Sequence, residues 1–314
     1  MNYYLFYLGF LKLRSLRIKE SESMNTVLIT DSSCDLSLDY IKSTNIDVMG
    51  IVLNFKGQDS IDDFGATVDY KTFYDDLRNG GMASTAQINT YRFYETFKKY
   101  VKEGKSIIYF AFSSGLSGTY NSSLLAKEQI LEEFPDADIS IVDSLCASMG
   151  VGLMVYYANE LLTNGASKAE VLKFLEDNKL RTNHYFTVND LNHLKRGGRV
   201  SATAATIGTI LDIKPVLHVD KAGHLIPIAK TKGRKKSIKY LFDAFKERVE
   251  NPEDQVIFIS HGDCQQDAEF LADMIRKEYK VKDIMINYIG PVIGAHSGPD
   301  TLALFFLGKS RSED

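Results

Sequence analysis

Four hydroxyl side chains lie within eight residues, directly after a predicted strand. The strand covers residues 106–112, residues 113–120 read Ser-Ser-Gly-Leu-Ser-Gly-Thr-Tyr, and a helix is predicted over 121–133. The free N–H groups at the start of such a helix favour an anion, and the hydroxyls add hydrogen-bond donors. The segment lacks the Lys-Ser/Thr ending of a P-loop and the Gly-x-Ser-x-Gly pattern of a nucleophile elbow. We expect it to bind an anionic group; the alternative is an ordinary capped turn.

Three further segments carry side chains suited to an oxygen-rich ligand. Residues 80–87 form a predicted loop of small and hydroxyl residues that contains Thr85. Arg199 follows a glycine pair, and its planar guanidinium suits a carboxylate or phosphate. A helix end with a glycine cap explains the cations before that pair, but not Arg199. His296 lies in a Gly- and Pro-rich segment, 289–299, expected to be a rigid loop; functional and structural roles for it are equally compatible with the sequence.

The sequence indicates no metal site. The cysteines at positions 34, 146 and 264 are far apart, and the histidines do not cluster. Residues 31–35 (Asp-Ser-Ser-Cys-Asp) follow the first strand; they suit a metal or sugar, or a helix cap at Asp35 or Ser37. Cys34 has no activating neighbour and is expected to behave as a small apolar residue. The odd, scattered cysteines favour a reducing, cytoplasmic compartment.

A basic cluster occupies residues 230–236, at the start of a predicted helix. Cations at a helix N-terminus oppose the helix dipole, by up to ~1 kcal/mol. An anionic partner would explain the cluster, and a solvated surface explains it equally well.

The whole chain has the composition of a globular protein. Its 314 residues are 44% apolar and 25% charged, and the formal net charge is −4. An acidic balance disfavours nucleic-acid binding as the main activity. Residues 1–23 are interpreted as an appendage, either the product of a misplaced start codon or a membrane-surface helix. Their apolar run is too short to span a bilayer.

Strands and helices alternate after residue 24, which predicts an α/β fold with a largely parallel sheet. The predicted strands are 27–30, 48–55, 106–112, 139–142, 185–188, 216–219, 225–229, 256–260, 284–288 and 302–307. The predicted helices are 68–78, 91–102, 121–133, 153–162, 168–178, 235–249 and 266–279. Residues 220–224 predict a hairpin turn. We place a domain boundary near residue 180, giving an α/β domain over 24–180 and an α+β domain over 181–310.

Taken together, these segments resemble the DegV family, over about nine-tenths of the chain. The resemblance is carried by residues 30–36, 113–120, 142–150, 191–201, 213–215 and 294–299. It implies the two-domain α/β arrangement called the EDD fold, with one long-chain fatty acid between the domains. It also implies a non-catalytic subunit without metal or cofactor, which presents the acid to a separate fatty acid kinase. The acyl phosphate would then pass to an acyltransferase of phospholipid synthesis, with transient contact at a membrane surface.

The resemblance also implies roles for particular residues. The carboxylate-binding threonine corresponds to Thr85, the loop serine to Ser114 or, less directly, Ser113, and the remaining pocket residues to Arg199 and His296. The family's Thr-Ser-Gln-Pro-Ser loop reads Thr-Ala-Gln-Ile-Asn here, so the proline that restricts the backbone and two serine hydroxyls are replaced. The basic residues implied for kinase docking are Arg234, Lys235 and Lys236.

The sequence is also compatible with two other functions. The first is a phosphotransferase or hydrolase acting on a small anionic substrate, with Ser114 as nucleophile and His296 as base. The second is a transcriptional or signalling module, which only the cluster at 230–236 favours.

Overall fold

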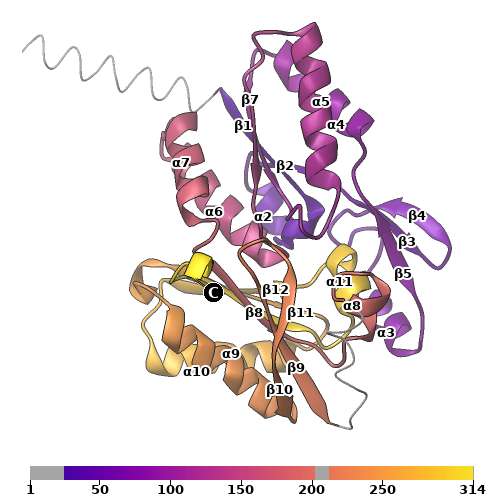
Figure 1. Ribbon diagram of the computed structural model, residues 1–314, viewed down its shortest axis with the longest axis vertical. Helices are drawn as coiled ribbons and strands as arrows, with labels where there is room; N and C mark the ends of the chain where they lie inside the picture. The colour runs from indigo at the N-terminus through magenta and orange to yellow at the C-terminus, as the bar shows by residue number, and fades with distance from the viewer. Residues whose placement is uncertain (1–24, 202–211, 314) are drawn as a thin grey trace, which may run out of the picture.

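A computed structural model describes residues 25–201 and 212–313 (Figure 1). The predicted appendage over residues 1–23 lies outside the described residues. Two main sheets stand one above the other in Figure 1, with a small third sheet beside them.

The first sheet has the strand order β2-β1-β6-β7, and every pairing is parallel. Its strands are β1 (Thr26–Asp31), β2 (Asp47–Met49), β6 (Ser106–Ala111) and β7 (Ile139–Asp143). Five consecutive residues of β6 are buried, as expected of a parallel strand that is covered on both faces. The parallel α/β architecture predicted for this part of the chain is confirmed.

Helices cover both faces of the first sheet. On one face lie α4 (Thr90–Lys102) and α5 (Thr119–Glu133), and on the other lie α6 (Met149–Thr163) and α7 (Lys168–Asn178). A short helix, α2 (Leu38–Lys42), follows β1. Ser167 and Glu170 form the predicted capping box of α7, which satisfies N–H groups that a helix start leaves open.

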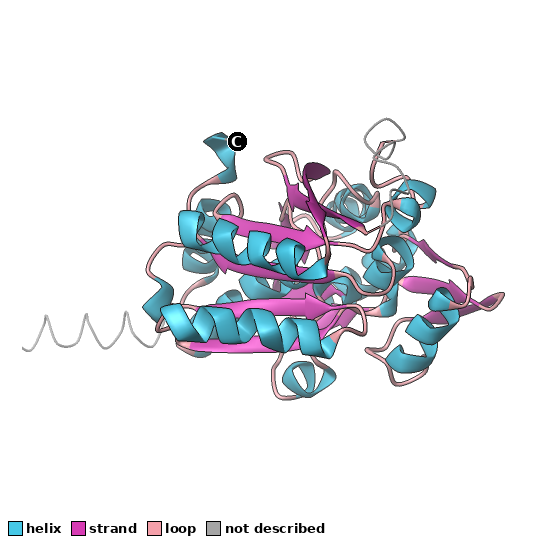
Figure 2. Cartoon of the chain, turned by 90° about the horizontal axis from the view of Figure 1, so that it is seen from below, coloured by secondary structure: helices cyan, strands magenta, loops and turns pink. Residues whose placement is uncertain are grey.

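The second sheet has the order β10-β9-β8-β13-β11-β12, mostly antiparallel. Its strands are β8 (Thr182–Thr187), β9 (Ile213–Val219), β10 (Leu225–Lys232), β11 (Val256–His261), β12 (Asp283–Tyr288) and β13 (Leu302–Leu307). The predicted hairpin is confirmed, because β9 and β10 pair antiparallel around residues 220–224. Two helices, α9 (Arg234–Arg248) and α10 (Gln265–Glu278), cover one face (Figure 2), and α6 packs toward the other.

The strand predicted over 48–55 is wrong as a single element. It is split between β2 in the first sheet and β3 (Val52–Phe55) in the small sheet, which has the order β4-β3-β5. The split occurs at Gly50, where an added Cβ would collide with the backbone of Asp62. Glycine therefore permits the close approach that redirects the chain.

Two predicted loops contain regular structure. Residues 80–87 include β5 (Ala83–Ala86), which pairs with β3, while β4 (Gln58–Ile61) pairs with the other edge of β3. The segment 289–299 contains a helix, α11 (Pro291–Ser297), which begins at a proline and ends at a glycine with positive φ. Proline is favoured at the first position of a helix and such a glycine just after its end. Two more helices lie near the site, α3 (Tyr70–Arg78) and α8 (Asn192–Arg196).

None of the helices within 25–201 and 212–313 is long and apolar enough to cross a membrane.

Candidate functional site

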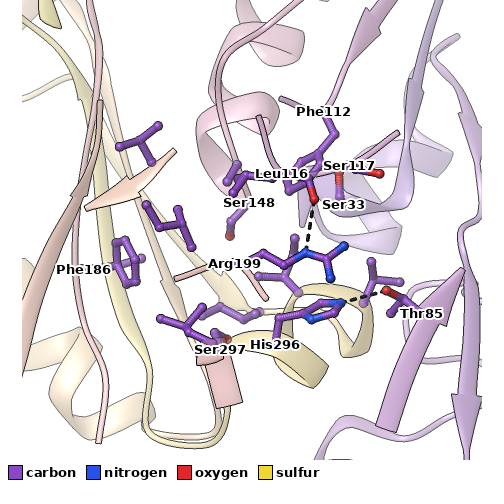
Figure 3. Close-up of a pocket in the computed structure, with 18 of the residues that line it drawn as sticks. Ser33, Thr85, Phe112, Leu116, Ser117, Ser148, Phe186, Arg199, His296 and Ser297 are labelled. Carbon is purple, nitrogen blue, oxygen red and sulfur yellow. Dashed lines mark hydrogen bonds between the residues drawn. The ribbon is translucent and has the colours of Figure 1, made fainter. Parts of the chain in front are cut away.

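A cavity of about 230 Å³ lies between the segments that follow the strands of the first sheet and one face of the second sheet (Figure 3). Both halves of the chain supply its wall. The first half contributes the loop after β6 and the start of α6, and the second contributes β8, the β9–β10 hairpin, α11 and β13. The apolar lining residues are Ile51, Phe112, Leu116, Ala147, Phe186, Leu194, Val219, Leu225, Ile289, Val292, Ile293, Ala303 and Phe305. Most of this cavity therefore suits a hydrocarbon rather than a polar metabolite.

Polar side chains converge on one part of this cavity. Thr85 projects from β5 and His296 from the last turn of α11, and Thr85 Oγ1 lies 2.8 Å from His296 Nε2 (Figure 3). Gly197, just after α8, packs against the imidazole so closely that an added Cβ would collide with His296 Nδ1. Thr85 and His296 are 211 positions apart in the sequence, and the fold brings their side chains together.

His296 is a neutral imidazole at pH 7. Burial, together with the nearby Arg199 cation, lowers its pKa to about 4. Its Nδ1 atom is buried and has no hydrogen-bond partner among the described residues. A neutral ring beside a guanidinium avoids repulsion between cations and leaves Arg199 as the positive charge of the site.

Arg199 extends into the cavity from the turn after α8. Its Nε donates to the carbonyl of Leu116 at 3.2 Å and its Nη1 to the carbonyl of Gly197. No carboxylate in the described parts of the chain forms an ion pair with it, and partial burial lowers its pKa. A half-buried guanidinium held by neutral carbonyls is prepared for an anionic ligand.

The structure does not bring Ser113 or Ser114 to the cavity. The Ser113 hydroxyl is buried and donates to the carbonyl of Gly223 at 2.9 Å. Ser114 is exposed, and its N–H donates to Asp143 Oδ1 at 3.1 Å. Ser117, from the same loop, lines the cavity instead, and so does Gln87, a polar lining residue that the sequence analysis missed. Residue type pointed to the correct loop, but not to the hydroxyl that faces inward.

The same geometry bears on the hydrolase interpretation. No described hydrogen bond joins Ser114 to His296, since Ser114 is held by Asp143 and His296 Nε2 is paired with Thr85. No described carboxylate is bonded to the His296 ring. A nucleophile activated by a base, with an acid behind it, is thus not assembled from these residues.

The two carboxylates of the segment after β1 bind other parts of the chain, while Ser33 of the same segment lines the cavity. Asp31 accepts from the N–H of Ser33, and Ser37 caps α2, as the capping interpretation predicted. Asp35 accepts from Ser148 Oγ at 2.5 Å and from the N–H of Gly290 at 2.9 Å, so it joins the starts of α6 and α11. Burial raises the pKa of both carboxyls. Within the described chain, no group of side chains has the makeup of a metal site.

The basic cluster is divided between a strand and a helix. Lys230 and Lys232 belong to β10, contrary to the prediction that the cluster begins a helix, and α9 starts at Arg234. Arg234 pairs with Asp267, with Nε 2.8 Å from the carboxylate. Lys235 and Lys236 are exposed to solvent.

Comparisons with known proteins agree on one family. The sequence profile described as "Uncharacterised protein, DegV family" matches residues 25–309. A DegV domain-containing protein of Clostridium perfringens, CPE0026, is 53% identical over 285 residues, covering 91% of this chain and 98% of the relative. Among solved structures, the Thermotoga maritima protein TM841, described as revealing a fatty acid binding function, has a TM-score of 0.78 at 30% identity, covering 91% of this chain and 99% of its own. A Thermus thermophilus DegV family protein, described by its fatty acid binding, has a TM-score of 0.81 at 28% identity, covering 91% of this chain and all of its own (100%).

Proposed function

The chain belongs to the DegV family, and on that premise we propose that it binds one long-chain fatty acid. The carboxylate lies at Thr85, Arg199 and His296, and the hydrocarbon chain fills the apolar part of the cavity. The fatty acid binding described for the Thermotoga and Thermus proteins supports this assignment.

The observation that carries the proposal is a cavity with a cationic, hydrogen-bonding region at Thr85, Arg199 and His296 and a lining in which apolar side chains outnumber polar ones. A long-chain fatty acid has the same division, because a single carboxylate is joined to a chain of methylenes. This match in polarity favours a long-chain acid over a small anion.

We further propose that the protein is a carrier rather than an enzyme. It presents the bound acid to a separate kinase and carries the acyl phosphate to an acyltransferase. The family resemblance supports this role, and so does the absence of a P-loop pattern from the sequence. Exposed Lys235 and Lys236 are available for docking, whereas Arg234 is engaged by Asp267.

Binding of saturated acids of increasing length tests the ligand assignment. Each added methylene should strengthen binding by ~0.8 kcal/mol, about fourfold, until the cavity is full. Delipidated protein titrated with acids from octanoate to eicosanoate should therefore show a steep rise and then a plateau. Affinity that does not depend on chain length would contradict a buried tail.

Two measurements test the carrier role. Purified protein supplied with an acyl phosphate or acyl ester should show no turnover; steady hydrolysis that disappears in Ser114→Ala would establish an enzyme. The double substitution Lys235→Glu and Lys236→Glu should weaken kinase-dependent phosphorylation while bound acid is unchanged. Reversal of two exposed helical charges that do not adjoin the cluster, Lys246 and Lys277, is the matched control.

A further inference from the structure

Arg311 is a fully buried guanidinium near the end of the chain, only 1% exposed. It lies beyond residues 25–309, the span that the family profile matches. Its Nη1 donates to the carbonyls of Val219 at 3.2 Å and Asp220 at 2.5 Å. Its Nη2 donates to the carbonyls of Leu145 at 3.0 Å and Lys179 at 2.9 Å. One side chain thus joins three segments that are far apart in the sequence.

Each of these segments leads directly to a wall of the cavity. Val219 lines the cavity itself, and Leu145 is two positions before Ala147, which also lines it. Lys179 precedes β8, whose His184 faces the cavity. Burial lowers the pKa of His184, and the Arg311 charge lowers it further. Figure 1 shows the yellow C-terminal end at the junction of the upper and lower halves.

Ser113 fastens the other side of the β9–β10 turn. Its hydroxyl donates to the carbonyl of Gly223, and the turn is seated so tightly that an added Cβ at Gly223 would collide with Ser113 Oγ. An added Cβ at Gly115 would lie 2.8 Å from the carbonyl of Ala222. The residues flanking this turn, Val219 and Leu225, both line the cavity. The turn therefore joins the two halves of the chain and forms part of the cavity wall.

We propose that Arg311 and Ser113 are positioning residues for the acyl chain, which fix the β9–β10 turn as a rigid wall and thereby slow the escape of the bound tail. The inference rests on the proposed function, because the chain behind that wall is the fatty acid. The planar fork of arginine reaches carbonyls on both sides at once, whereas the point charge of lysine cannot. We call Arg311 and Ser113, together with the turn that they fix, the clamp. Neither residue touches the carboxylate site, so the clamp acts on dissociation of the tail and not on recognition of the acid.

Stopped-flow dissociation of cis-parinaric acid, a fluorescent long-chain acid, tests the clamp in the full-length protein. Bound probe is displaced by excess oleate at a temperature where every variant is folded, as checked by thermal unfolding without ligand. Ser113→Ala should raise the dissociation rate about three- to tenfold, as expected for the loss of one neutral hydrogen bond. Arg311→Lys should raise it about tenfold or more, because hydrogen bonds from a charged group are lost. If Arg311→Lys does not fold, the dissociation rate of Ser113→Ala alone tests the proposal.

The matched control is Arg248→Lys. Arg248 also holds the C-terminal segment, through Ser310 O at 3.1 Å, and it contacts Asn183 Oδ1 at 2.8 Å. The rate at which the probe dissociates from Arg248→Lys should stay within about twofold of the wild-type rate, even if the thermal stability of the variant falls. Unchanged rates in both clamp variants, or equal acceleration in Arg248→Lys, would overturn the clamp alone. A wild-type protein that binds neither probe nor oleate would overturn the proposed function and the clamp together.

Discussion

Replacing Arg199 with glutamine should weaken binding of a long-chain acid about 10- to 100-fold without abolishing it. The guanidinium is half-buried and is held by the carbonyls of Leu116 and Gly197. A hydrogen bond to a charged group contributes ~1.5–3 kcal/mol, which corresponds to the expected loss. Burial of about 16 methylenes contributes ~13 kcal/mol, so the tail should keep the ligand in the cavity.

Isothermal titration of the delipidated protein with palmitic acid and with hexadecanol separates the contribution of the carboxylate from that of the hydrocarbon tail. The alcohol has the same chain and no carboxylate, so Arg199→Gln should reduce binding of the acid but leave that of the alcohol within about twofold. Lys195→Gln removes an equal charge from an exposed position in the neighbouring helix α8 and is the control. Equal losses for acid and alcohol would refute the reasoning, because Arg199 would then support the fold and not the head group.

Three further predictions concern the same region. Because the pKa of His296 falls to about 4 in the folded protein, the wild type should lose up to ~3 kcal/mol of unfolding free energy between pH 6.5 and pH 4, and urea unfolding of His296→Gln should lack this loss. Gly197→Ala should displace the His296 ring and weaken palmitate binding about tenfold in the same titration, and unchanged binding would contradict the packing. Burial raises the pKa of Asp62 to about 6, so above that pH the buried carboxylate is charged and lowers the free energy of unfolding. Asp62→Asn should therefore stabilise the protein by about 1–3 kcal/mol at pH 7 and by little at pH 4, as measured by urea unfolding.

The local pattern of the sequence predicted the α/β architecture well, because buried strands and amphipathic helices have different periodicities. It failed where long-range pairing decides the structure. The four residues of β5, Ala83–Ala86, show no strand pattern, and they become a strand because β3 offers them a partner. Likewise, α11 contains Gly294 and is flanked by Gly290 and Gly298, yet it forms a helix. Tyr74 packs against it and donates a hydrogen bond to the carbonyl of Ile289 just before it.

The candidate site was predicted in part. Arg199 stood out because a helix end did not explain it, and His296 because it lies in a Gly- and Pro-rich segment. The role of Thr85 came from the family resemblance, and the structure brings all three residues to one cavity. Ser113 and Ser117 lie in the same loop and have the same side chain. The sequence does not show that the Ser113 hydroxyl bonds to Gly223 while Ser117 lines the cavity, because this difference depends on a tertiary contact. The apolar part of the cavity could not be inferred, since the sequence does not distinguish its residues from those of an ordinary hydrophobic core.

Mass spectrometry of an organic extract from the purified protein tests the central claim most directly. The proposal predicts one long-chain fatty acid per protein molecule, and a reduced content of palmitate after incubation of the delipidated Arg199→Gln variant with limiting acid. An empty extract, together with failure of the delipidated wild type to take up added palmitate or oleate, would contradict fatty acid binding.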